Sequence, residues 1–447
     1  MTPEAAPAVF GELVGQEPVV EQLRLAVAAS RAPAGSASPG GVPAGPGMTH
    51  AWLFTGPPGS GRSVAARAFA AALLCADQGC GQCPSCRQVA AGSHADLLLV
   101  RPDGLSYGVR QTRDLVLRAA AAPIYGRWRV VLFEDADRAT EQAANALLKA
   151  IEEPAPRTVW LLCAPSADDL PTTIRSRCRL VTLRTPATAA VTEVLVRSGV
   201  AEDAALDAAR AAQGHIGRAR RLATDPEAAG RRAEVLKVPL QVSAGLGRAL
   251  ASAADLVKAA EAEAAAITEE LDQPERDALR RAFGEGSTGK GVASAVRGAA
   301  GALKELEDRQ KSRTTRLKRD ALDRALLDLA GFYRDVLAVQ FGADVELANA
   351  AQRAELDQVA AVSSPETTVR RIEAIMKCRE RLAASVAPLL AVEEMTLALA
   401  ARGRSVTRRD HWAGRGRTSV PGPCWPPCAT QASEHRPGRR GGFVTVP

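Results

Sequence analysis

The sequence has no long apolar runs and few aromatic residues. No stretch approaches the roughly 18 consecutive apolar residues of a membrane-spanning helix, so we expect no membrane protein. Residues 1–15 contain neither a basic segment nor an apolar core, so we also expect no secretory signal. Apolar residues make up 46%, charged residues 24% and aromatic residues 4% of the 447 residues. This balance, at this length, indicates a cytoplasmic globular protein of several domains.

Excess positive charge is absent from most of the chain. The net charge is +7, but nine arginines and only two acidic residues lie beyond residue 400. The preceding residues carry 48 basic and 48 acidic side chains, so the pI is no argument for a DNA-binding core. Residues 403–447 are rich in Gly, Pro and Arg and show no periodicity. We predict that this segment is a disordered basic tail.

Four of the nine cysteines lie within twelve residues: Cys75, Cys80, Cys83 and Cys86. In a large chain without an expected secretory signal, this spacing favours metal ligands over disulfides. Four thiolates close a tetrahedral Zn²⁺ site, and a turn too small for its own core needs such a crosslink. We therefore predict a structural zinc site, with free thiols or an iron–sulfur cluster as the alternatives.

Short apolar segments alternate with helical patterns in the first 185 residues. The segments that we predict as strands are 51–55, 96–100, 128–134, 158–163 and 179–183. Because they are almost wholly apolar, they predict a parallel α/β sheet covered by helices on both faces. This first domain spans 1–185, and a Gly-, Pro- and Ser-rich segment at 32–48 predicts a flexible loop within it.

No convincing strand follows Pro186. We predict a small helical lid domain at 186–235 and a larger helical domain at 236–402. Apolar residues at helical spacing indicate the core faces of two helices in the second of these domains. One stripe is Leu322, Leu326, Leu329, Tyr333 and Val336, and another begins with Val369, Ile372 and Met376.

The sequence GPPGSGRS follows the first predicted strand and opens a helix, which is the context of a phosphate-binding loop. The candidate nucleotide-binding residues are Gly56, Pro57, Pro58, Gly59, Ser60, Gly61, Arg62 and Ser63. Glycines allow backbone N–H groups to surround phosphate, and Ser63 would hold Mg²⁺. Arg62 stands where such loops carry lysine, and its planar fork does not replace a compact ammonium. ATP binding with Mg²⁺ and a loop that binds no nucleotide both remain open.

Acidic residues end the third predicted strand, with Glu134 followed by Asp135 and Asp137. In P-loop ATPases an acid at this place binds Mg²⁺ and a neighbouring group positions the attacking water. Here the usual order of Asp and then Glu is inverted, so each carboxylate reaches a different distance. Glu134 and Asp135 are the catalytic candidates, but hydrolysis requires accurate placement, so we predict weak or absent turnover. The alternative is a pair of carboxylates at a solvated strand end.

Two arginines are candidates for contact with nucleotide. Arg177, in the sequence SRC after a predicted strand, has the character of an arginine finger that acts in trans on a neighbouring subunit. Arg218, in GHIGRARRL, lies on a predicted lid helix from which it would reach phosphate. The alternatives are a surface ion pair for Arg177 and a solvated helix face for Arg218.

Several motifs taken together resemble a known family. They are LVGQ at 13–16, HAWLFTGPPGSG at 50–61, LLC…CGQCPSC at 73–86, NALLKAIEEP at 145–154 and TIRSRC at 173–178. They resemble bacterial clamp-loader subunits, AAA+ proteins with a zinc module after the P-loop helix, and most of all the delta-prime family of DNA polymerase III. The resemblance covers about residues 10–220, and the helical remainder fits the family's collar domain in size and class.

The resemblance implies the stator type of subunit rather than the ATP-hydrolysing gamma/tau motor. Arg62, the inverted Glu134–Asp135 pair and CAPS at 163–166 all depart from the motor pattern. The implied protein has little ATPase of its own and lends Arg177 to a neighbour's ATP. Its implied partners are gamma/tau and delta in a hetero-oligomeric ring, and through them the sliding clamp and primed DNA at the nucleoid. A gamma/tau-type motor and an AAA+ module of recombination are the alternatives.

Overall fold

The computed structural model describes residues 7–31, 47–102, 104–283 and 292–401. Five parallel strands form one sheet in the order β2-β3-β4-β1-β5. The strands are β1 (Ala51–Thr55), β2 (Leu97–Val100), β3 (Arg129–Phe133), β4 (Thr158–Ala164) and β5 (Arg179–Thr182). The central strands β1, β3 and β4 are buried along their whole length. The predicted five-stranded parallel sheet is therefore confirmed.

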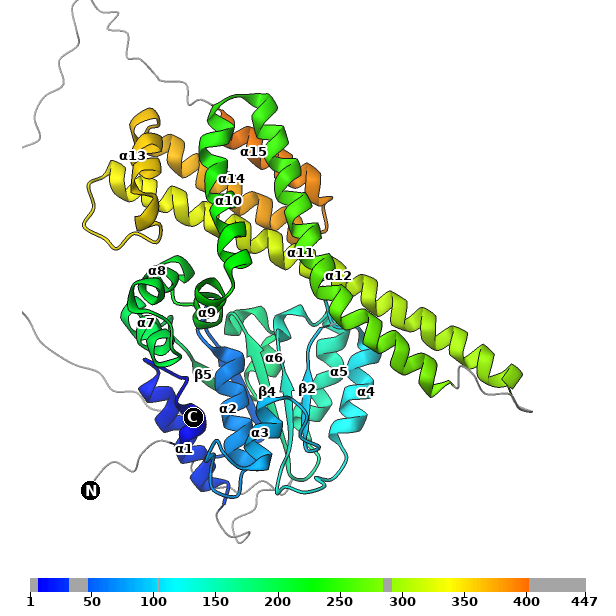
Figure 1. Ribbon diagram of the computed structural model, residues 1–447. Helices are drawn as coiled ribbons and strands as arrows, with labels where there is room; N and C mark the ends of the chain where they lie inside the picture. Colours follow the sequence, from blue (N-terminus) through cyan, green and yellow to red (C-terminus); the bar gives the residue numbers. More distant parts are fainter. Residues whose placement is uncertain (1–6, 32–46, 103, 284–291, 402–447) are drawn as a thin grey trace, which may run out of the picture. The chain divides into compact units, whose positions relative to one another are not determined.

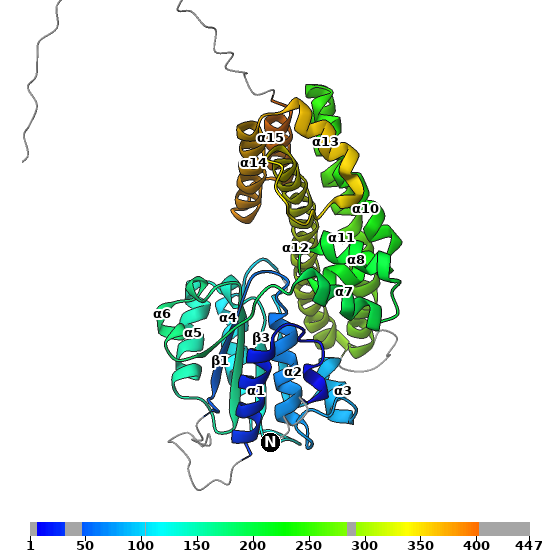
Figure 2. The same cartoon turned by 90° about the vertical axis from the view of Figure 1, so that its left-hand side faces the viewer.

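Helices cover both faces of the sheet (Figures 1 and 2). They are α1 (Glu17–Ala29), α2 (Arg62–Leu74), α3 (Pro84–Ala90), α4 (Val109–Ala119), α5 (Glu141–Glu152) and α6 (Thr172–Arg175). The core with α1, α2 and α3 includes Trp52 and Phe69, whose rings meet edge to face at 5.0 Å. The opposite core, with α4, α5 and α6, includes Leu53 and Leu147. Successive β1 residues thus point to opposite cores, as the alternation of a strand requires.

Three helices follow the sheet and enclose a small core of their own. They are α7 (Thr188–Arg197), α8 (Glu202–Ala212) and α9 (Ile216–Thr224). This core is built mainly from small side chains such as Ala205 and Ala209, together with Val191 and Leu195. These helices make up most of the predicted lid domain, and residues 186–235, all of them described, contain no strand.

Further helices come next. They are α10 (Pro226–Ser243), α11 (Leu246–Ala282), α12 (Val292–Gln340), α13 (Arg353–Val362), α14 (Pro365–Ala383) and α15 (Pro388–Ala400). Helices α11 and α12, the longest among the described residues, lie side by side as a long hairpin (Figure 1). The predicted stripe from Leu322 to Val336 is confirmed, because all five of its residues are at most 1% exposed within one core.

Two expectations for these helices differ from the structure. Val369 and Met376 on α14 are about 40% exposed, so of the second predicted stripe only Ile372 packs against this core. The buried residues of α14 include Ile375, Cys378 and Leu382. The predicted division between lid and collar at residue 235 lies inside α10, which continues to Ser243.

Further elements are short. They are the 3-10 helices η1 (Ala8–Phe10), η3 (Ala136–Arg138), η4 (Ala167–Asp169) and η5 (Ala350–Gln352). Most of the predicted loop at 32–48 and all of the predicted tail at 403–447 lie outside the described residues. Across the described helices, none combines the length and the apolar character needed to cross a membrane.

Candidate functional site

The glycine-rich loop connects the carboxyl end of β1 to the first residue of α2, Arg62. Gly56, Gly59 and Gly61 have φ angles of 152°, 89° and 89°, which favour glycine. A Cβ atom on Gly59 would lie 2.5 Å from the Cβ of His215, so no larger residue fits there. The loop ends at a helix N-terminus, whose free backbone N–H groups and dipole favour an anion.

A pocket of about 250 Å³ opens at this loop. Its walls are the N-terminal segment 12–16, the loop residues 59–64 and the lid residues around His215. Ser60 lines it, is 2% exposed, and its Oγ has no hydrogen-bond partner in the described residues. A buried hydroxyl without a partner is costly, so Ser60 is suited to bind a polar ligand. The exposed Pro57 and Pro58 lie at the outer side of the loop.

Arg62 folds back onto the loop that precedes it. Its Nη1 donates a hydrogen bond to the carbonyl oxygen of Gly56, with 2.5 Å between the two atoms. The next residue, Ser63, lies close to the buried thiol of Cys163 on β4, and burial raises the pKa of that thiol. Arg62, which was predicted to contact phosphate, thus has a partner within its own loop.

Glu134, just after β3, is bound by two arginines. Arg67 on α2 approaches Oε1 to 3.1 Å, and Arg101 after β2 approaches Oε2 to 2.8 Å. The Glu134 side chain is only 13% exposed. The hydroxyl of the buried Tyr107 donates a hydrogen bond to the Glu134 backbone carbonyl oxygen, with 2.5 Å between the two oxygens. These contacts fix Glu134 and neutralise its charge.

The two aspartates after Glu134 differ in their surroundings. Asp135 has a left-handed φ of 49° and a 3.9 Å ion pair with Arg138. Asp137 has a buried Oδ1 with no hydrogen-bond partner in the described residues. Burial and then the charge of Asp135 raise the pKa of Asp137, while the charge of Arg62 acts in the opposite direction. Asp137 is therefore the acid of this cluster that still lacks a partner for one oxygen.

Arg177 lies between α6 and β5, outside the pocket at the glycine-rich loop. Its Nη2 forms a 2.8 Å ion pair with Glu152 on α5, and its Nη1 donates to the carbonyl oxygen of Thr173. The side chain is 40% exposed. Its charge is thus held at the surface of the α4–α5–α6 side of the sheet.

Arg218 and Arg220 lie on different sides of α9. Arg218 forms an ion pair with Asp328 on α12, whereas Arg220 lines the pocket at the glycine-rich loop and lies 3.5 Å from Glu12. Residues two positions apart on a helix are separated by about 200° around its axis, which accounts for the difference. The structure therefore does not bring Arg218 to the predicted nucleotide site, and it brings Arg220 there instead.

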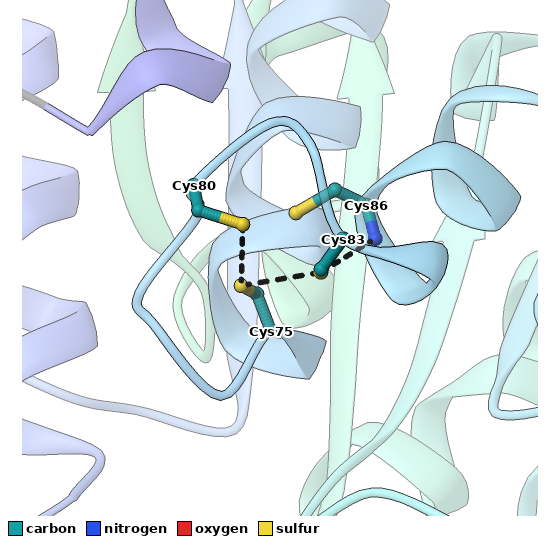
Figure 3. A group of neighbouring side chains, drawn as sticks. All are labelled: Cys75, Cys80, Cys83 and Cys86. Carbon is teal, nitrogen blue, oxygen red and sulfur yellow. Dashed lines mark hydrogen bonds between the residues drawn. The ribbon is translucent and has the colours of Figure 1, made fainter.

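The four cysteines between α2 and α3 converge (Figure 3). All four Sγ atoms lie within 4.8 Å of one another, and Cys75 Sγ lies 3.7 Å from the Sγ atoms of Cys80 and Cys83. A tetrahedral ion with bonds of 2.3 Å to sulfur needs sulfur separations of about 3.8 Å. A disulfide needs only about 2.05 Å. Cys75, Cys80, Cys83 and Cys86 therefore fit a metal site, and the residues between them lie in a turn with little core of its own.

Residues 46–187 match the family model described as DNA polymerase III, delta subunit. The DNA polymerase III subunit delta' of Pseudomonas aeruginosa is 40% identical over 155 residues, which are 33% of this chain and 47% of that protein. Subunit gamma/tau of Mycobacterium tuberculosis is 37% identical over 177 residues, which are 38% of this chain and 28% of that protein. Residues 46–187 are therefore similar to subunits of DNA polymerase III.

The matched segment contains the glycine-rich loop, the cysteine cluster, Glu134 and Arg177, whereas Arg218 and Arg220 lie beyond it. The chain spans less than half the length of these two relatives. A gamma subunit-related protein of Thermotoga maritima superposes with a TM-score of 0.34 and 15% identity. That superposition covers 79% of this chain and 94% of the other. The predicted fold class, a parallel α/β sheet domain followed by helical domains, is confirmed.

Proposed function

We propose that this chain is a clamp-loader subunit of the stator, delta-prime type in the DNA polymerase III holoenzyme. In this role it assembles with gamma/tau and delta subunits in a ring and helps the ATP-dependent loading of the sliding clamp on primed DNA. The similarity of residues 46–187 to delta' and gamma/tau subunits supports the assignment. We assign it to the cytoplasm, at the nucleoid, where such a complex meets DNA.

The observation that carries the stator assignment is the pairing of Glu134 with Arg67 and Arg101. An acid at this strand end must be free to hold Mg²⁺ if the site is to hydrolyse ATP. Releasing Glu134 from two guanidinium groups would leave both of them without a partner and would cost free energy. We infer that this chain hydrolyses ATP slowly or not at all. It contributes no polymerase chemistry of its own.

Arg177 is the group that we assign to catalysis in the complex. It is partly exposed and does not line the pocket of its own chain, and its ion pair with Glu152 is a surface pair worth little free energy. Little is therefore lost when Arg177 leaves Glu152 to reach the phosphates of an adjacent subunit's ATP. In that position its charge stabilises the transition state of the neighbour's hydrolysis.

We assign the ion of the four-cysteine cluster as structural Zn²⁺. All four ligands come from the protein, so no position remains for water or substrate, and this is the pattern of structural sites. Backbone N–H groups aid the deprotonated form. Burial tends to raise the pKa of Cys75, but hydrogen bonds from Cys80, Gly79 and Asp77 lower it to about 7. The ion would crosslink the turn to the ends of α2 and α3.

The second candidate is an ATP-hydrolysing motor of the gamma/tau type. It is favoured by the 37% identity to gamma/tau of Mycobacterium tuberculosis and by the retained loop glycines. The two candidates differ in what the purified chain does alone.

The test is a measurement of ATP turnover stimulated by DNA and clamp. It compares this chain alone, the partner gamma/tau and delta subunits alone, and the mixture. A stator is silent alone and raises turnover in the mixture. Turnover by the chain alone, lost on Ser63→Ala, would establish the motor instead. Failure to bind either partner would contradict both and favour a role outside the clamp loader.

A further inference from the structure

The residues that would hold Mg²⁺ in a P-loop ATPase do not fit that ion here. The ion is normally bound by the loop's Ser or Thr and by an acid at the strand end. In this chain the acid, Glu134, is bound by Arg67 and Arg101. Ser63 lies close to the buried thiol of Cys163, which is not a ligand that magnesium prefers. Magnesium also requires near-ideal octahedral oxygen ligation, which these engaged groups do not supply.

The pocket nevertheless keeps the features that bind phosphate. The three loop glycines retain the positive φ angles of a phosphate cradle, and α2, 13 residues long, begins at the pocket. The buried Oγ of Ser60 lacks a partner and lies in the pocket wall. An unpaired donor so deeply buried is an observation independent of the helix terminus, and it points to a polar ligand.

A fixed positive charge already lies at this place. Arg62 is anchored by its hydrogen bond to the Gly56 carbonyl, and within the described residues it makes no other hydrogen bond. Its remaining N–H donors suit the oxygens of a polyphosphate, for which a guanidinium fork is well matched. Across the pocket, Leu13, Val14 and Ile216 provide an apolar wall of the kind that holds a nucleobase.

We propose that this pocket binds a nucleoside di- or triphosphate without a divalent cation, with the Arg62 guanidinium as the built-in counter-ion of the phosphates. The ligand then fixes the lid against the glycine-rich loop and is not hydrolysed. The inference concerns the isolated chain and goes beyond the proposed role in the clamp loader. It can fail while the stator role holds, and the reverse is also true.

The experiment is a titration of fluorescently labelled ADP with the purified full-length protein, in excess Mg²⁺ and in excess EDTA. We expect the same Kd within about twofold in the two buffers. Unlabelled ADP, ATP and pyrophosphate should each displace the label, since the phosphates are the groups recognised. Arg62→Ala should weaken binding by about 10- to 100-fold in both buffers, as expected for the loss of charge-assisted hydrogen bonds.

Arg197→Ala is the matched control. It removes one positive charge from an exposed arginine on α7 whose ion pair is with Glu193, and it should leave the Kd unchanged. Circular dichroism verifies that Arg62→Ala is folded. Binding seen only with Mg²⁺, binding in neither buffer, or a Kd unaffected by Arg62→Ala would each overturn the proposal. So would a failure of pyrophosphate to displace the label.

Discussion

Arg67 on α2 and Glu134 at the end of β3 form an ion pair, with 3.1 Å between Nη2 and Oε1. Arg67 and Glu134 are 67 positions apart in the sequence. Arg101, just after the end of β2, also forms an ion pair with Glu134. The negative charge expected to hold a metal ion therefore serves instead to connect a helix with two strand ends. Glu134 should therefore contribute to the stability of the fold and not to catalysis, and the two effects can be measured separately.

Glu134→Gln tests this directly. We expect a loss of about 2 kcal/mol in the free energy of unfolding, because two arginines lose their shared partner. We expect no change in the ATP turnover that the chain stimulates in partner subunits. Urea unfolding and the mixed turnover assay measure the two effects. Glu373→Gln, an exposed change on α14, should alter stability by no more than about 0.5 kcal/mol. A stable variant with lost turnover would restore a catalytic role for Glu134.

The cysteine cluster predicts one zinc ion per chain. Cys83→Ser should remove the ion and lower the free energy of unfolding by at least ~3 kcal/mol, since the turn between α2 and α3 loses its crosslink. Metal analysis by mass spectrometry and thermal unfolding provide the readouts. Cys178→Ser, at a half-buried cysteine outside the cluster, is the control and should retain the ion. An iron content, or clearly less than one zinc per chain in the unmodified protein, would refute the assignment.

The two lid arginines should behave differently. Arg220→Ala should weaken ADP binding several-fold, because Arg220 lines the pocket. Arg218→Ala should leave the Kd unchanged but destabilise the protein by about 1–3 kcal/mol, because the buried Asp328 loses one of its two arginine partners. The same titration and urea unfolding distinguish the effects. The reverse pattern, with ADP binding lost only in Arg218→Ala, would mean that α9 turns its other face to the nucleotide.

Asp96 predicts an acid-sensitive contribution to stability. Burial tends to raise its pKa, but hydrogen bonds from the backbone N–H groups of Ile124, Tyr125 and Gly126 outweigh burial, and the pKa is lowered. A lowered pKa in the folded state stabilises the protein above the pKa of the unfolded chain. That stabilisation is lost as the pH falls through the folded pKa.

Asp96→Asn should therefore lower the free energy of unfolding at neutral pH by about 3 kcal/mol. It should also flatten the loss of stability below about pH 4. Urea unfolding at a series of pH values measures both. An equal acid dependence in the variant would show that other carboxylates govern it.

The sheet was predictable because each strand is a short apolar run and helical patterns lie between the runs. The single turn α6 has no such signal, since Thr172–Arg175 is too short for a periodic pattern. On α14 apolar residues lie on two faces, and spacing alone did not distinguish Ile375 and Cys378, which are buried, from Val369 and Met376. Burial of that helix is decided by its packing on α12 and α15.

The glycine-rich loop and the four cysteines were recognisable because their residues are close in sequence and their chemistry depends on spacing. The partners of Glu134 were not recognisable, because Arg67 and Arg101 come from separate elements. Arg220 was missed in favour of Arg218 for a related reason. A helical pattern shows that two residues lie on different faces, but only the tertiary structure shows which face meets the pocket.

The central claim is that this chain acts on a neighbour's ATP through Arg177, and one measurement tests it most directly. ATP turnover stimulated by DNA and clamp is measured for gamma/tau and delta subunits with the unmodified chain, with Arg177→Ala and with Arg175→Ala. Arg175 is the control, a nearby arginine paired with Asp168. We predict that Arg177→Ala still assembles but lowers the turnover about 10³-fold or more. Where gamma/tau and delta alone turn over ATP faster than that, turnover falls only to their level. Arg175→Ala should leave the turnover unchanged. Full turnover with Arg177→Ala in an assembled complex would contradict the account.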